Sequence, residues 1–179
     1  MKKRDNKYNF KISAIAAIIS AILFLPAFII GIFLVLQPNN PNIRIFEIII
    51  SVIGVLLGLV VIYGYIKISE YEKNYFLRVM CFILIPLLII STIITLFFKE
   101  YLVVLYIFIV IYGVIEILFG SALIKLKKTY GGIALSLGII YIVNGAFYSS
   151  ILLFFLTFFT SLTTTILEII LFFKAAKKY

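Results

Sequence analysis

The stretch LVVLYIFIVIYGVIEILFGSALI, residues 102–124, is apolar along its length except for one carboxylic acid, Glu116. A membrane-spanning helix needs about 20 consecutive residues that are mostly apolar, and this stretch meets that requirement. An ionised carboxyl near the middle of such a helix costs at least ~2.5–3.5 kcal/mol on insertion scales. The stretch therefore predicts a transmembrane helix and raises the question of what Glu116 does inside it.

Five further apolar stretches accompany it. Three precede it, at about 12–36, 45–66 and 79–98. The first is longer than the apolar core of a signal peptide and lacks a cleavage site, so we expect it to remain as a span. From 131 to 173 the chain has no strongly polar break. One helix there would be roughly 65 Å long, about twice the hydrocarbon thickness. We therefore predict two spans, at about 132–150 and 153–173.

The basic residues decide between five and six spans. With six, all of the 16 lysines and arginines except Arg44 and Lys99 lie on one side of the membrane. With five, the lysines at 174, 177 and 178 move to the other side, and the asymmetry weakens. We therefore predict an all-α integral membrane protein: a six-transmembrane-helix bundle with short loops and no soluble domain. Residues 1–179 form a single membrane domain in this prediction, with both termini in the cytoplasm.

The composition agrees with a membrane protein and excludes several kinds of site. Hydrophobic residues make up 65% of the chain and charged residues 13%, against about 45–50% and about 25% in soluble domains. The net charge of +9 follows from topology, so no nucleic-acid partner is expected. With no histidine and a single cysteine, Cys81, the chain has no cysteine cluster for zinc or iron–sulfur and no histidine for haem, and we expect no metal and no cofactor.

The residue usage also suggests an origin. Isoleucine, lysine and tyrosine are abundant and tryptophan is missing, a composition that resembles small polytopic membrane proteins of AT-rich prokaryotes. We therefore expect a multi-pass protein of a prokaryotic cell membrane.

Small residues at helical spacing predict where the helices approach one another, because they let backbones come close inside a bilayer. The predicted helix-packing residues are Ser51, Gly54 and Gly58 in the second span, Gly113 and Gly120 in the fourth, and Ala134, Gly138 and Gly145 in the fifth.

Glu116 lies on the same helix face as Gly113 and Gly120, so we expect it in a groove that another helix can enter. Every polar group in the membrane needs a partner. Tyr112, one turn earlier, is the expected hydroxyl donor, and Lys67 at the same end of the second span is a candidate counter-ion. Without that counter-ion, we expect Glu116 to be neutral.

The sixth span carries a second polar feature. Thr157, Ser161, Thr164 and Glu168 fall along one helical stripe, which should face protein or water rather than lipid. Together with Glu116, Tyr112 and Lys67, these residues form a possible intramembrane polar site in the cytoplasmic half of the bundle.

Two functional hypotheses follow. Without histidine, no Ser–His–Asp or Cys–His set exists, and we expect no enzyme. Short loops and small-residue faces favour a non-catalytic accessory or structural subunit that packs against other membrane proteins or against copies of itself. The alternative is a small proton- or cation-coupled transporter or channel, because a carboxyl kept neutral by the membrane can exchange its proton for a cation.

Overall fold

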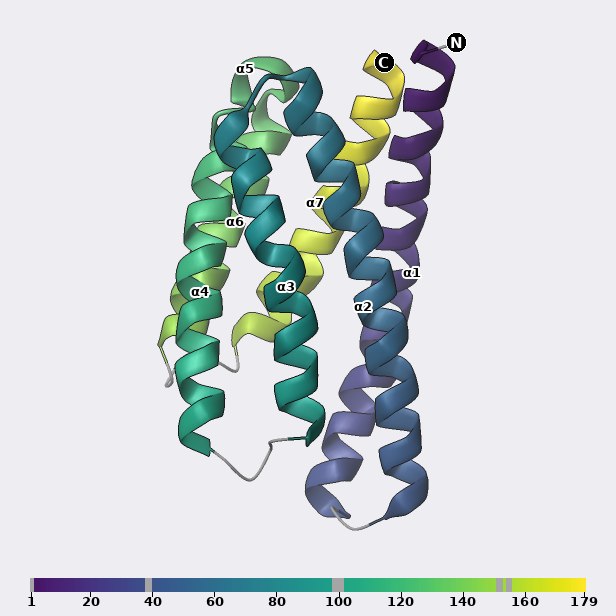
Figure 1. Ribbon diagram of the computed structural model, residues 1–179, viewed down its shortest axis with the longest axis vertical. Coiled ribbons are helices and arrows are strands. Elements are labelled where there is room, and N and C mark those ends of the chain that lie inside the picture. The colour runs from purple at the N-terminus through teal and green to yellow at the C-terminus, as the bar shows by residue number, and fades with distance from the viewer. Residues whose placement is uncertain (1, 38–39, 98–101, 151–152, 154–155) are drawn as a thin grey trace.

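The computed structural model describes residues 2–37, 40–97, 102–150, 153 and 156–179. Within these residues, six helices are long and apolar enough to cross a membrane. They are α1 (Lys2–Leu36), α2 (Pro41–Tyr71), α3 (Tyr75–Phe97), α4 (Leu102–Ile124), α6 (Gly132–Ser149) and α7 (Thr157–Lys178); a short helix, α5 (Lys127–Tyr130), joins α4 to α6 (Figure 1). The predicted all-α polytopic membrane bundle is confirmed.

The ends of the helices differ from the predicted spans for local reasons. α2 begins at Pro41 rather than near residue 45, because Asn40 caps it: its side-chain oxygen accepts a hydrogen bond of 3.1 Å from the backbone N–H of Asn42. Proline suits the first helical position, where an N–H would lack a partner. α7 begins at Thr157 rather than near residue 153 and continues to Lys178. Residue 98 and residues 154–155, close to predicted boundaries, lie outside the described residues.

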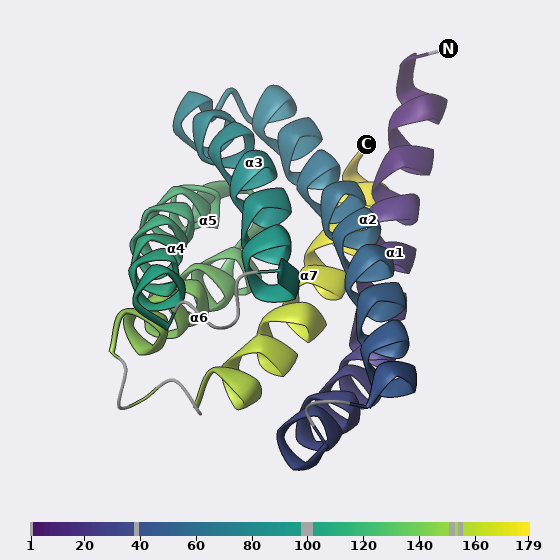
Figure 2. The same ribbon diagram turned by 60° about the horizontal axis from the view of Figure 1, so that its bottom comes forward.

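The long helices form a closed ring in chain order. Each packs against the next, α1 on α2, α2 on α3, α3 on α4, α4 on α6 and α6 on α7, and α7 returns to pack on α1. Figure 2 shows α7 passing between α6 on one side and the α1–α2 pair on the other. Because the first and last helices are neighbours, the interior of the ring is bounded by every spanning helix.

The apolar core lies toward the end of the bundle that holds both chain termini (Figure 1). Phe10 of α1, Tyr65 of α2, Phe119 of α4 and Phe172 of α7 are all fully or almost fully buried there. The rings of Tyr65 and Phe119 meet edge to face, with centroids 5.1 Å apart. At the opposite end α2 is joined to α3 by a hydrogen bond of 2.7 Å from the guanidinium of Arg44 to the carbonyl oxygen of Leu96.

Polar contacts close the end that holds the termini. Glu72, just after α2, accepts hydrogen bonds from Thr129 of α5 at 2.6 Å, from Lys178 at 2.8 Å and from the hydroxyl of Tyr179. Asn74 caps α3 by accepting from the N–H of Leu77 and also donates to the carbonyl of Ala122 in α4. This end of the bundle is therefore tied together by side chains from several connections.

Candidate functional site

A cavity of about 230 Å³ lies inside the ring, and we call it the central cavity. Every spanning helix contributes to its wall. Examples, one from each helix in order, are Ser20, Tyr65, Leu88, Glu116, Asn144 and Glu168. Both carboxyl groups that the sequence places within the membrane therefore face the same space. The described residues that line the cavity include no lysine or arginine.

Glu168 of α7 is bound by two tyrosines from two other helices. Its Oε1 accepts a hydrogen bond of 2.9 Å from the hydroxyl of Tyr65 in α2 and one of 2.5 Å from the hydroxyl of Tyr141 in α6. Glu168 is 6% exposed. The hydrogen bonds that the described residues make to this carboxyl both end on Oε1. Oε2 therefore has no such donor within the described residues.

Glu116 of α4 is bound by an amide. Its Oε2 accepts a hydrogen bond of 2.7 Å from the side-chain nitrogen of Asn144 in α6. The side-chain oxygen of Asn144 accepts in turn from the hydroxyl of Thr160 in α7. Both Glu116 and Asn144 are buried. A chain of polar groups thus links three helices across the wall of the central cavity.

Glycines place Asn144 beside Glu116. A methyl group at Gly113 would lie 2.5 Å from the carbonyl oxygen of Gly145, and one at Gly120 would lie 2.5 Å from that of Gly138. Contacts this short require backbones in near contact, which only glycine permits. α4 and α6 therefore cross closely in antiparallel register, and the carboxyl between the two α4 glycines reaches the α6 side chain that precedes Gly145.

Comparison with protein-family models, curated proteins and solved structures finds no match for this chain.

The structure brings most of the predicted polar residues to the central cavity. Tyr112, Ser161 and Thr164 line it together with Glu116 and Glu168. Thr157 lies instead beside a neighbouring cavity of about 350 Å³ between α1 and α7, which Ser161 also borders. The hydroxyl of Thr164 donates to the carbonyl oxygen of Thr160 one turn earlier, so much of its hydrogen bonding stays within α7.

Two predicted partners of Glu116 are wrong. Lys67 does not serve as its counter-ion: its ammonium lies 2.8 Å from Glu70, one turn further along α2, close to the end of the bundle. Tyr112 does not supply the hydroxyl donor, because the hydrogen bond to Glu116 comes from Asn144. The ring of Tyr112 instead meets that of Tyr148 edge to face, with centroids 5.4 Å apart. The position of Tyr112 one helical turn before Glu116 suggested a hydrogen bond, but α6 packs against α4 and supplies the donor from Asn144 instead.

The remaining predicted packing residues differ in their surroundings. Ala134 of α6 is fully buried, and a methyl group at Gly58 of α2 would meet Leu88 of α3. Gly54 has open space around the position of a Cβ, and Ser51 is only half-buried. Of the two predicted glycines of α2, only Gly58 packs closely against another helix.

Sequence reasoning missed Tyr65, Tyr141 and Asn144, which make the hydrogen bonds to the two carboxyls. A signal for two of them was present. Tyr141, Asn144 and Tyr148 recur at helical spacing along one face of α6, in the same way as the polar stripe of α7. Tyr65 gave no comparable signal, because it belongs to no polar stripe along α2 like those of α6 and α7.

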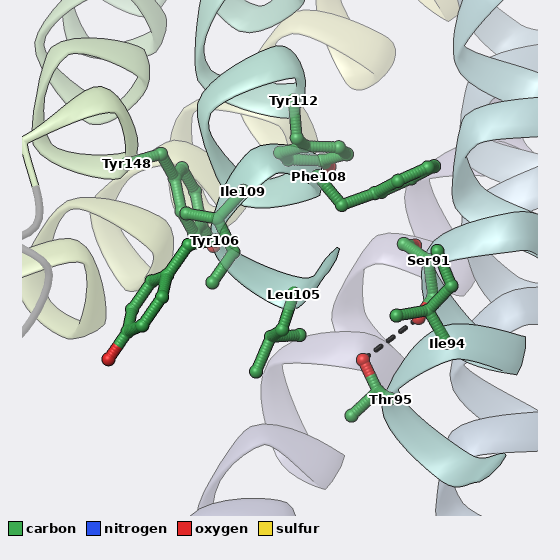
Figure 3. Close-up of a pocket in the computed structure, with 9 residues that line it drawn as sticks. All are labelled: Ser91, Ile94, Thr95, Leu105, Tyr106, Phe108, Ile109, Tyr112 and Tyr148. Carbon is green, nitrogen blue, oxygen red and sulfur yellow. Dashed lines mark hydrogen bonds between the residues drawn. The ribbon is translucent and has the colours of Figure 1, made fainter. Parts of the chain in front are cut away.

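A larger cavity, of about 610 Å³, lies between α3 and α4, and we call it the α3–α4 cavity (Figure 3). It is lined from α3 by Ser91 and Thr95 and from α4 by residues that include Leu105 and Tyr106. These positions lie toward the end of the bundle opposite the termini. Tyr112 and Tyr148 border both this cavity and the central one. The two tyrosine rings therefore stand between the two spaces.

Proposed function

We propose that this protein is a small proton- or cation-coupled membrane transporter or channel, and that the central cavity is its binding site. One observation carries the proposal: Glu116 and Glu168 face a single cavity that every spanning helix lines. A carboxyl that only joins two helices needs one partner and no open space. Here each carboxyl is held by protein donors on one oxygen and borders a space large enough for a solute.

The charges around the cavity support a cationic solute. Lys67, the nearest candidate counter-ion in the sequence, pairs with Glu70 instead. The groups that hold the carboxyls, two tyrosine hydroxyls and an amide, are neutral. Intramembrane acids in such settings exchange protons or bind cations in pumps and transporters. The proposed chemistry is the binding of a cation and its exchange for a proton, with no covalent bond made or broken apart from that to the proton. We therefore propose that the protein is not an enzyme.

Reconstituted vesicles test this proposal. We expect purified protein to dissipate a proton gradient when a counter-gradient of a permeating monovalent cation is imposed, with the internal pH followed by a dye. Glu168→Gln and Glu116→Gln keep the shape of a neutral acid and should reduce the initial rate at least tenfold. Glu70→Gln is the matched control, because Glu70 lies outside the cavity and pairs with Lys67. Its rate should match that of the wild type.

The competing hypothesis of an accessory subunit has its own signature. Such a protein would co-purify with other membrane proteins in fixed proportion, and its vesicles would leak no faster than empty ones. Either equal rates for the Glu168 and Glu70 variants or no rate above that of empty vesicles would overturn the transport proposal.

We propose a prokaryotic cell membrane as its location, with both termini in the cytoplasm. The supporting observation is the clustering of basic side chains, such as Lys125, Lys128 and Lys177, at the end of the bundle that holds the termini (Figure 1). In a Cys81→Ser background, Lys177→Cys should react with an impermeant maleimide only after the cells are opened. Asn42→Cys, exposed at the other end, should react in intact cells. The reverse pattern would invert the topology.

A further inference from the structure

We infer that the solute bound in the central cavity is a small primary ammonium ion, an alkylamine in its protonated form. This inference rests on the proposed function and names the substrate class of the same site. It combines three properties of the cavity: its carboxyl oxygens, its aromatic wall and its size.

The carboxyl oxygens favour a solute that carries N–H donors. Tyr65 and Tyr141 both donate to Oε1 of Glu168, and Asn144 donates to Oε2 of Glu116. The hydrogen bonds given by the described residues thus leave one oxygen of each carboxyl to accept from another group. An ammonium group carries three donors and a positive charge, so it can bind such an oxygen by a charge-assisted hydrogen bond.

The aromatic wall favours an organic cation. Tyr65, Phe119 and Tyr141 all line the cavity next to Glu168. The ring of Phe119 meets the other two edge to face, with centroids 5.1 Å and 4.9 Å away. Aromatic rings attract ammonium groups within about 6 Å of their centroids, and they also provide an apolar surface for an alkyl chain. Tyr112 and Tyr148 extend the same kind of surface toward the α3–α4 cavity.

The donor set fits a metal ion poorly. Calcium takes six to eight oxygen ligands and magnesium demands an octahedral set. Within the described residues, no three Asp, Glu, His or Cys side chains come together as a metal site would need. The nearby hydroxyls of Tyr65 and Tyr141 donate to Glu168, so they already serve as hydrogen-bond donors to this carboxyl.

The volume of the central cavity suits a solute with a short chain. The cavity of about 230 Å³ is smaller than the ~300–1,000 Å³ typical of pockets for drug-sized ligands. At about 30 Å³ per water, it has the volume of roughly seven or eight waters. An amine with a few carbon atoms fits this space.

Thermal unfolding of the purified protein in detergent tests the inference with n-butylammonium as the probe. We expect millimolar n-butylammonium chloride to raise the unfolding temperature by several degrees. Neither 1-butanol, which has the same chain without the charge, nor potassium chloride at the same ionic strength should do so. Glu168→Gln should remove the effect, and the control variant Glu70→Gln should keep it. An equal shift with 1-butanol, or a full shift in Glu168→Gln, would overturn the inference.

The vesicle assay separates failure of this inference from failure of the proposed function. If n-butylammonium neither binds nor competes while proton or potassium movement still depends on Glu116 and Glu168, the transport proposal stands and the amine assignment is wrong. If no movement depends on the two carboxyls and no amine binds, both are wrong. Competition by n-butylammonium, but not by 1-butanol, with the Glu168-dependent flux would support both.

Discussion

At the scale of single residues, Asn144 connects the most groups. It donates to Glu116 of α4, accepts from Thr160 of α7 and stands on α6, so one amide joins three helices. An amide suits this position because it is donor and acceptor at once. It also keeps one oxygen of the Glu116 carboxyl turned toward α6.

Replacing Asn144 with leucine should therefore destabilise the bundle. The variant loses two hydrogen bonds and leaves Glu116 without its donor, and we expect the free energy of unfolding to fall by about 1–3 kcal/mol. Unfolding titrations in mixed micelles with increasing SDS measure this change. Ser136→Leu, at an exposed position of the same helix, is the control and should stay within about 0.5 kcal/mol of the wild type. If the two variants unfold alike, the amide does not hold the three helices together.

At the scale of helices, the contact between α4 and α6 positions the site. Glycine pairs bring the backbones together at two levels, Gly113 with Gly145 and Gly120 with Gly138. Glu116 lies between these levels, so the distance between the helices sets the length of its hydrogen bond to Asn144. A separation of α4 from α6 would lengthen that bond.

Gly120→Ala tests this arrangement. The added methyl group would lie 2.5 Å from the carbonyl oxygen of Gly138, a backbone atom, so the helices must move apart. We expect a loss of about 1–3 kcal/mol in unfolding free energy, as for other overpacked interiors. Gly54→Ala is the matched control, because nothing lies within 4 Å of the added methyl group. Alanine favours the helix there, so this variant should be unchanged or up to about 1 kcal/mol more stable. A greater loss for Gly54→Ala than for Gly120→Ala would contradict the structure.

The sequence predicted the spanning helices better than it predicted the contacts of the site. Six apolar stretches of sufficient length predicted six spans, because a helix can cross a bilayer only if it is long and apolar enough. Glu116 and Glu168 were predictable as interior groups, because lipid excludes them. Their partners were not: Tyr65 is 103 residues away from Glu168 in the chain, and the two meet only because α7 closes the ring. The order of helices around a ring leaves no local pattern in the sequence.

At the scale of the whole molecule, one carboxylate fixes the end of the bundle that holds the termini. Glu72 receives hydrogen bonds from α5 and from the last two residues, Lys178 and Tyr179, and the ring of Tyr179 stacks on that of Tyr71 at 4.6 Å. Partial burial raises the pKa of Glu72, but the hydrogen bonds from Lys178, Thr129 and Tyr179 outweigh it. The pKa of this carboxyl therefore lies below its ordinary value of 4.5.

This lowered pKa predicts how stability depends on pH. A carboxyl with a depressed pKa in the folded state stabilises the fold above its ordinary pKa, and the contribution is lost as the pH falls through the folded value. We expect the wild-type unfolding temperature to fall as the pH drops below about 4.5, and Glu72→Gln to flatten part of that fall. Lys178→Met should lower the unfolding temperature at pH 7, while Lys177→Met, an exposed control on the same helix, should not. A Glu72→Gln curve parallel to the wild type would sink the assignment.

The closed ring also has a consequence for biogenesis. α7 provides Glu168 and the contact with α1, and it is the last of the described helices to be synthesised. At ~5–20 residues per second, the residues between Tyr65 and Glu168 take roughly 5–20 s to translate. During that time the hydroxyl of Tyr65 lacks the carboxyl of Glu168, and the ring has a gap between α1 and α6. A nascent chain arrested before α7 would hold most of the wall of the central cavity and still lack one of its two acids, so the binding site comes into being only when the final helix is inserted.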